Sequence, residues 1–208
     1  MPEELPVHIQ KQIKQGIEII KNGGVIAFPT DTVYGLGAGA YIESAIERIF
    51  QVKQRPPEMA LPLLLADVVH IHEVAQNVPA YAWRLIERFF PGGLTLVVYR
   101  TKMVKDIITA GGDTVAIRIQ DHPVALALIK GSGMPIIGTS ANISGQPNSL
   151  TYEEVCQQIG DKVDLVIYGA PAPNWKQSTV VDVTGEIPVI LLLVAISRAE
   201  LERVVEIV

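Results

Sequence analysis

The sequence predicts an α/β fold, in a single domain where helices pack on one β-sheet of mixed strand direction. Three observations predict this. Helical and strand-like segments alternate along the whole chain. The length of 208 residues suits one large domain. The composition, 49% hydrophobic and 19% charged, is rich in core-forming residues. No repeat, low-complexity tract or linker divides the chain, so one domain over residues 1–208 is expected.

The first element is an amphipathic helix over residues 7–22. Ile9, Ile13, Ile17 and Ile20 recur at helical spacing, and Gly23-Gly24 provides a stop. A short buried strand is expected next, and apolar periodicity predicts the elements that follow. These are strands over 25–28, 61–66 and 94–99, and helices over 45–50, 67–75 and 80–90.

Residues 114–120 show the clean alternation of a strand. Val115, Ile117 and Ile119 share one face, and Thr114, Ala116 and Arg118 share the other. Further elements are a helix over 123–130 and strands over 135–139, 163–168, 178–183 and 189–194.

Two capping boxes mark helix starts in the C-terminal part. Thr151 with Glu154 opens a helix that runs through Ile159, and Ser197 with Glu200 opens the last helix. In that last helix the apolar residues Leu201, Val204 and Val205 are expected to face inward.

Composition and charge exclude several classes of protein. The longest apolar runs, 61–66 and 187–196, fall short of the ~18–20 residues of a membrane-spanning helix. The first residues do not resemble a signal peptide, so we expect a cytoplasmic protein that binds no membrane. A net charge of −5 argues against broad phosphate-driven binding of nucleic acid. The single cysteine, Cys156, excludes an internal disulfide and is expected in the core.

Residues 29–37, Pro-Thr-Asp-Thr-Val-Tyr-Gly-Leu-Gly, follow a predicted strand directly. Small polar side chains and glycines at a strand end favour a ligand site in α/β folds. The same residues also form ordinary turns, and that alternative stays open.

Lys53 and Arg55 place two cations at the end of a predicted helix, just before Pro56-Pro57. Such cations can present their charge to a phosphate. They can equally complement the negative end of the helix dipole.

Arg118 shares its strand face with Thr114 and the small Ala116. An unpaired guanidinium in the core is costly, so Arg118 either reaches solvent at a strand end or pairs with an anion.

Two more polar segments follow predicted strands or begin them. Residues 139–145, which include Ser140 and Asn142, offer hydroxyl and amide donors to a phosphate or ribose, or form a capped turn. Ser178 and Thr179 begin a strand, where their β-propensity alone is a sufficient explanation. His70 and His72 are two residues apart on a predicted helix and point to different faces, so no metal site is expected there.

Taken in order, six segments resemble the YrdC/TsaC family, the threonylcarbamoyl-AMP synthases. They are GGVIAFPTDTVYGLGA, IFQVKQRP, FPGGLTLVV, DTVAIRIQDHPVALALI, GTSANISGQP and STVVDVTGEIPVI, and they span residues 23 to about 190. The resemblance implies a twisted mixed sheet with flanking helices and a large concave cleft. It also implies the short form of the family, without the additional C-terminal domain of the longer members.

The resemblance implies an enzyme that joins L-threonine, bicarbonate or CO2, and ATP into L-threonylcarbamoyladenylate, with release of pyrophosphate. Mg²⁺ accompanies the ATP. A partner protein then transfers the threonylcarbamoyl group to tRNA, so that tRNA is reached indirectly.

The resemblance also assigns roles to residues of this chain. Lys53 and Arg55 are the expected catalytic cations, on the ATP phosphates. The expected threonine contacts are Thr32, Arg118, Gly138 and Ser178. The expected ATP contacts are Lys53, Arg55, Thr114, Ser140, Asn142 and Asn148. No resident metal is expected.

One departure concerns the end of the matching region. Leu192 stands where the family usually has an ATP-contacting arginine, and Val194 where it has a glycine. A lost charged hydrogen bond costs roughly 1.5–3 kcal/mol, unless another cation such as Lys176 substitutes. Two alternative functions therefore stay open: a non-catalytic module that binds nucleotide or double-stranded RNA, and a paralogue with different carbamoyl chemistry.

Overall fold

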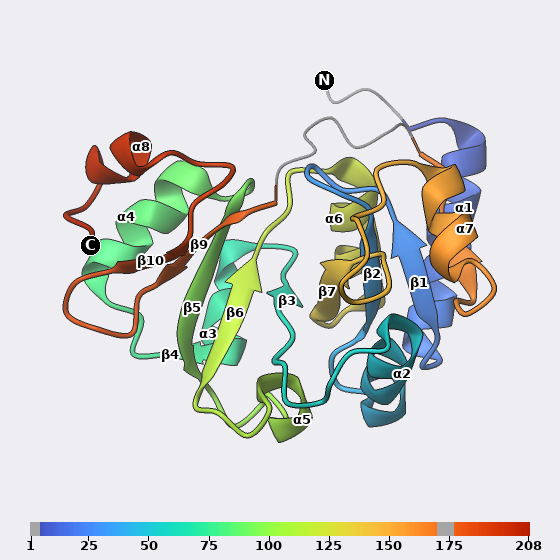
Figure 1. Ribbon diagram of the computed structural model, residues 1–208, viewed down its shortest axis with the longest axis horizontal. Helices are drawn as coiled ribbons and strands as arrows, with labels where there is room; N and C mark the ends of the chain where they lie inside the picture. The colour runs from blue at the N-terminus through green and yellow to red at the C-terminus, as the bar shows by residue number, and fades with distance from the viewer. Residues whose placement is uncertain (1–4, 170–176) are drawn as a thin grey trace.

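The computed structural model describes residues 5–169 and 177–208. Within these residues, ten strands form one mixed sheet in the order β10-β9-β5-β6-β3-β7-β2-β1-β8, with β4 beside β5 (Figure 1). The strands are β1 (Val25–Phe28), β2 (Gly35–Gly39), β3 (Leu63–Leu64), β4 (Ala75–Gln76), β5 (Leu94–Arg100), β6 (Thr114–Arg118), β7 (Ile136–Ser140), β8 (Leu165–Val166), β9 (Thr179–Asp182) and β10 (Val189–Leu192). The expected fold class is confirmed.

The helices pack on both faces of this sheet, which divides the core in two. Along β1, Val25 and Ala27 join one apolar cluster, whereas Ile26 and Phe28 join the other. Figure 1 shows α1, α2 and α7 around the β1 end of the sheet, and α4 and α8 beside β9 and β10. The helices are α1 (Val7–Lys21), α2 (Glu43–Lys53), α3 (Ile71–Val74), α4 (Ala80–Phe89), α5 (Asp106–Thr109), α6 (Pro123–Ser132), α7 (Tyr152–Ile159) and α8 (Arg198–Glu202), with a 3₁₀ turn η1 (Val68–His70).

Most predicted elements are confirmed, with shifts of a few residues at their ends. Both capping boxes are present. In each, the side chain of the first residue (Thr151 or Ser197) accepts a hydrogen bond from the backbone N–H of the glutamate three residues later, and that glutamate's carboxylate accepts one from the backbone N–H of the first residue. Leu201 and Val205 are buried as expected, and Val204 is half-buried. The expected helix over 67–75 is instead the turn η1 followed by the single helical turn α3, and the strand expected over 61–66 contracts to β3.

The main element that the sequence did not predict is β2. Its three glycines have low strand propensity, and residues 29–37 were interpreted as a loop or turn after the first strand, so no strand was expected over 35–39. In the structure β2 is buried between β1 and β7 and pairs antiparallel with both. A Cβ on Gly37 would crowd the ring of Phe28 and the carbonyl of Ile137, so the close approach of these neighbours requires glycine.

The expectation for Cys156 was wrong, because its side chain is exposed. The buried stripe of α7 runs through Val155 and Ile159, four residues apart, and this turns Cys156 toward solvent. Across the described ranges, none of the helices has both the length and the apolar character needed to cross a membrane.

Candidate active site

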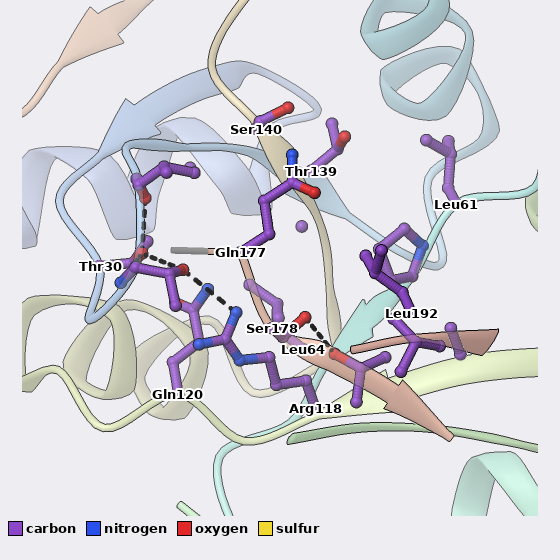
Figure 2. Close-up of a pocket in the computed structure, with 18 of the residues that line it drawn as sticks. Thr30, Leu61, Leu64, Arg118, Gln120, Thr139, Ser140, Gln177, Ser178 and Leu192 are labelled. Carbon is purple, nitrogen blue, oxygen red and sulfur yellow. Dashed lines mark hydrogen bonds between the residues drawn. The ribbon is translucent and has the colours of Figure 1, made fainter. Parts of the chain in front are cut away.

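A cavity of about 380 Å³ opens where the loop after β1 meets the ends of β6, β7 and β9 (Figure 2). Antiparallel pairing of Gly35 with Ser140 brings the polar segments 29–34 and 139–145 together, although they lie more than a hundred residues apart. Six of the residues singled out in the sequence line this cavity: Thr32, Arg55, Arg118, Gly138, Ser140 and Ser178. Four others do not line it: Lys53, Thr114, Asn142 and Asn148.

Arg118 is buried, and its guanidinium is paired within the chain. Its Nη2 donates to both carboxylate oxygens of Asp31, its Nε donates to the carbonyl of Gly92 at 2.9 Å, and its Nη1 donates to Thr32 at 3.2 Å. Burial lowers the pKa of Arg118, and the charge of Asp31 opposes that shift. Of the two alternatives for Arg118, the structure therefore shows pairing with an anion, and that anion is Asp31.

The loop after β1 is held in shape by its own hydroxyl groups. Thr30 Oγ1 accepts a hydrogen bond from the backbone N–H of Thr32 at 3.1 Å and donates to the carbonyl of Val33. The two threonine hydroxyls are 3.2 Å apart, as Figure 2 shows at Thr30. In this conformation Thr32 lines the cavity and accepts a hydrogen bond from Arg118. The loop therefore forms an ordered part of the cavity wall.

Ser178 lies just before β9 and shares a 2.8 Å hydrogen bond with the hydroxyl of Thr95 on β5. Parallel pairing of these strands places Leu94 opposite Thr179, which brings the two hydroxyls side by side. Both residues line the cavity. Thr95 was not among the expected site residues, because an isolated threonine within an apolar strand carries no signal of its own.

Lys53 is the last residue of α2, and only 2% of it is exposed. Its ammonium donates to the carbonyl of Ser140 at 2.6 Å and to the carbonyl and side-chain oxygens of Asn142 at 2.9 and 3.2 Å. Burial, with a smaller contribution from the charge of Arg55, lowers the pKa of Lys53 to about 8. In this structure the ammonium therefore holds the loop that follows β7.

The side chain of Asn142 also forms its hydrogen bonds within this loop. Its side-chain N–H groups donate to the carbonyls of Ile143 and Gln146, at 3.1 and 2.6 Å. Asn148 is half-buried, outside the cavity. Its neighbour Ser149 is fully buried and donates to the carbonyl of Ala141 at 2.9 Å. The polar residues of this loop thus fix its path beneath Ser140.

Arg55 lies on the cavity wall just beyond α2. The left-handed conformation of Gln54 ends the helix and turns the chain. The guanidinium of Arg55 donates from Nη2 to the carbonyl of Ala60 at 2.9 Å and from Nε to that of Met59 at 3.3 Å. Burial lowers the pKa of Arg55, which is a second cation lining the cavity.

Thr114 lies at the opposite end of β6 from Arg118. Four residues of a strand span about 13 Å, and Thr114 pairs with Tyr99 rather than reaching the cavity. The two side chains do share a strand face, but the structure does not bring them into one site.

Gln120 is a cavity residue that was not among the expected site residues. Gln120, two residues beyond Arg118, is buried, and its Oε1 has no hydrogen-bond partner in the described part of the chain. Its spacing from Arg118 was the signal that could have identified it.

Leu192, at the position of the family arginine, lines the cavity (Figure 2). Lys176, which was suggested as a substitute cation, lies outside the described residues.

The described residues contain no group of three or more His, Cys, Asp or Glu side chains that could hold a metal ion. The cavity instead offers two guanidinium groups, several hydroxyls and the backbone of β7. Such donors suit an anionic ligand that also carries polar groups.

Comparisons with known proteins identify relatives of this chain. The family model described as Telomere recombination (Sua5/YciO/YrdC) matches residues 18–192. The chain is 38% identical to the threonylcarbamoyl-AMP synthase of Bacillus subtilis and 39% identical to that of Pyrococcus abyssi. Both alignments cover 93% of the present chain. It spans little more than half of these two relatives, 56% and 57% of their lengths.

Solved structures extend the comparison. The structure of P. abyssi Sua5 complexed with L-threonine matches with a TM-score of 0.93 and 38% identity, over 99% of this chain and 61% of that one. Escherichia coli YciO matches with a TM-score of 0.81 and 31% identity, over 89% of this chain and 90% of that one. The fold, the cavity and the extent of these matches together show that the chain belongs to the Sua5/YciO/YrdC family.

Proposed function

We propose that this chain catalyses the ATP-dependent synthesis of L-threonylcarbamoyladenylate from L-threonine and bicarbonate or CO2, with release of pyrophosphate. The observation that carries the proposal is the cavity itself. It joins Arg118, Thr32 and Ser178 with Arg55, Ser140 and the backbone at Gly138 in one space. The names of the relatives from B. subtilis and P. abyssi, and the L-threonine in the P. abyssi structure, support the same reaction.

The amino-acid end of the cavity is proposed around Arg118, Thr32 and Ser178. Arg118 uses Nη2 for Asp31 and Nε for Gly92, so a ligand carboxylate would reach it through Nη1 unless Asp31 withdraws. The hydroxyls of Thr32 and Ser178 can complete the carboxylate's hydrogen bonds. The expected contact of Arg118 with threonine is therefore proposed through Nη1 while Asp31 stays in place.

The nucleotide end is proposed around Arg55, Ser140 and the loop held by Lys53. Arg55 would contact the phosphates directly, because it lines the cavity. Lys53 would contact a phosphate by exchanging one loop carbonyl for a phosphate oxygen, since its ammonium already has three acceptors. The nucleotide contacts of Thr114, Asn142 and Asn148 remain predictions, and Mg²⁺ is proposed to enter as part of the ATP substrate.

In the proposed reaction the threonine amine attacks the carbon of CO2 and forms a carbamate, while its proton passes to solvent. A carbamate oxygen then attacks the α-phosphorus in line, the bond from the α-phosphorus to the bridging oxygen breaks, and pyrophosphate leaves with that oxygen. The chain contributes orientation of both substrates and positive charge near the phosphates. We assign no general base.

The test is release of pyrophosphate by the purified protein with ATP, Mg²⁺ and bicarbonate, measured with and without L-threonine. Release that depends on threonine supports the proposal, and its absence, or release without threonine, refutes it. Arg55→Ala should abolish turnover while thermal unfolding stays cooperative. Gln157→Met, an exposed substitution on α7, should change neither property.

The transfer of the product to tRNA by a separate partner protein, and a cytoplasmic location, are part of the proposal. If turnover is absent, titration with double-stranded RNA over a range of salt concentrations tests the non-catalytic alternative.

A further inference from the structure

Thr95 is a buried polar residue on an otherwise apolar strand. Its neighbours on β5, Leu94 and Leu96, belong to the apolar core, whereas Thr95 lies on the opposite face of the strand and lines the cavity. Only 6% of Thr95 is exposed. Within the described ranges its hydroxyl has one hydrogen-bond partner, Ser178 at 2.8 Å, and Figure 2 marks this bond at Ser178. The hydroxyl of Thr95 is therefore bonded to another cavity residue and not to the backbone.

The adjacent hydroxyls of Ser178 and Thr179 have different surroundings. Thr179 is fully buried, and its Oγ1 donates to the carbonyl of Ile196 and accepts from the N–H groups of Val194 and Ile196, at 2.9, 3.0 and 2.9 Å. A hydroxyl donates one hydrogen bond and accepts two, so Thr179 has no capacity left. Ser178 is half-buried, lines the cavity and, in the described part of the chain, forms one side-chain bond, to Thr95. Ser178 therefore keeps capacity for a ligand.

The direction of the bond between the two hydroxyls decides what Ser178 can offer. If Ser178 donates to Thr95, its proton is used and only its lone pairs remain for a ligand. If Thr95 donates, Ser178 keeps its proton and can donate it to an acceptor. A carboxylate beside Arg118 only accepts hydrogen bonds, so it selects the second arrangement. The bond from Thr95 also strengthens the bond that Ser178 donates, because linked hydroxyls polarise one another.

We propose that Thr95 is a positioning residue, whose hydroxyl donates to Ser178 Oγ and holds the Ser178 proton toward the carboxylate of the amino-acid substrate. The inference rests on the proposed function, since it assumes that an amino acid occupies the Arg118 end of the cavity. Thr95 acts through Ser178 and not as a substrate contact. Loss of its hydroxyl should therefore weaken threonine binding and leave the nucleotide end, around Arg55 and Ser140, unaffected.

The experiment compares Thr95→Val, which keeps the shape of the side chain and removes the hydroxyl, with Thr95→Ser, which keeps the hydroxyl. Calorimetry measures the affinity for L-threonine, and pyrophosphate release gives the KM values for threonine and ATP. Thr95→Val should bind threonine about threefold to tenfold more weakly, with a matching rise in the KM for threonine and an unchanged KM for ATP. Thr95→Ser should stay close to the wild type in all three values.

Thr184→Val is the matched control. It also removes one hydroxyl from a threonine, whose 2.6 Å hydrogen bond to Asp182 lies outside the cavity. This variant should leave the affinity for threonine and both KM values unchanged.

A double-mutant cycle separates positioning from packing. In the Ser178→Ala background, Thr95→Val should cause no further loss of threonine affinity, because the residue through which Thr95 acts is gone. A further loss of the same size as in the wild type would assign the effect to packing and overturn the inference. Thr95→Ser losing as much affinity as Thr95→Val would overturn it too. If Thr95→Val does not unfold cooperatively, Thr95→Ala takes its place in the same cycle.

The outcomes also separate this inference from the proposed function. If the wild type releases pyrophosphate only with threonine, and Thr95→Val binds threonine like the wild type, only this inference fails. Absence of threonine-dependent release in the wild type refutes the proposed function and this inference together.

Discussion

Asp31 holds Arg118 with both of its carboxylate oxygens, at 2.8 and 2.9 Å from Nη2. The pair joins the loop after β1 to the end of β6, and both side chains are largely buried, 12% and 8% exposed. Neither charge can return to water without opening the loop. The pair is therefore a structural connection as well as part of the site.

Removing the carboxylate should destabilise the protein. Asp31→Asn leaves a buried guanidinium without its counter-charge, and we expect the free energy of unfolding to fall by about 3 kcal/mol. Urea unfolding measures this. The double variant Asp31→Asn with Arg118→Met should be more stable than Asp31→Asn alone, because no unpaired charge remains. Equal stability of Asp31→Asn and the wild type would contradict a paired role for these residues.

Nucleotide binding should weaken as pH rises through the pKa of Lys53. Burial lowers that pKa to about 8, so the side chain is cationic below this pH and neutral above it. Under the proposed function the affinity for ATP falls between about pH 7 and pH 9, because the phosphates lose a cation. Titration of a non-hydrolysable ATP analogue measures this. The Lys53→Met variant should bind the analogue weakly at all these pH values. If its affinity still falls as the pH rises, the pH dependence belongs to another group.

Gly138→Ala should be destabilising for a reason of packing. A Cβ at this position would overlap the side chain of Leu64, and the backbone cannot yield because its N–H donates to Pro62 at 3.0 Å. We expect a loss of about 1–3 kcal/mol, measured by thermal or urea unfolding. Gly185→Ala is the control, since its Cβ would meet only an ordinary contact at 3.5 Å. Combining Gly138→Ala with Leu64→Ala should cost less than the sum of the two single changes.

Leu192→Arg should strengthen ATP binding if the nucleotide end of the cavity is where we propose it. Leu192 lines the cavity and is 40% exposed, so an arginine there has room and access to solvent. One charged hydrogen bond corresponds to an affinity gain of about tenfold or more. Leu191→Arg, on the neighbouring exposed residue outside the cavity, should give no comparable gain. Equal effects of the two changes would indicate only a general effect of positive charge.

The sequence predicts well those features that depend on local pattern. Helices with apolar stripes, such as α1, and both capping boxes follow from residues a few positions apart. The mixed sheet also agrees with expectation. β2 was missed because the close contacts that require glycine at position 37 come from Phe28 and Ile137, which lie on its neighbours in the sheet.

The polar contacts of the site could not be read from the sequence for a similar reason. Lys53 and Arg118 were recognised as cations of the site, but their partners, Ser140 and Asp31, come from distant segments. A sequence identifies a charged side chain but not whether the chain itself neutralises it. Thr114 shows a different limit of the sequence. The alternating pattern puts it on the same strand face as Arg118, but the two residues lie at opposite ends of β6.

The position of β3 has a consequence for how ligands affect the protein. Its two residues, Leu63 and Leu64, pair with β6 on one side and β7 on the other, and so connect the two halves of the sheet. The cavity takes Arg118 from one half and Ser140 from the other. A ligand that contacts both residues therefore acts as a cross-link over the narrowest connection in the sheet, and it should slow hydrogen exchange at the amides of β3 more than at those of β1 or β10.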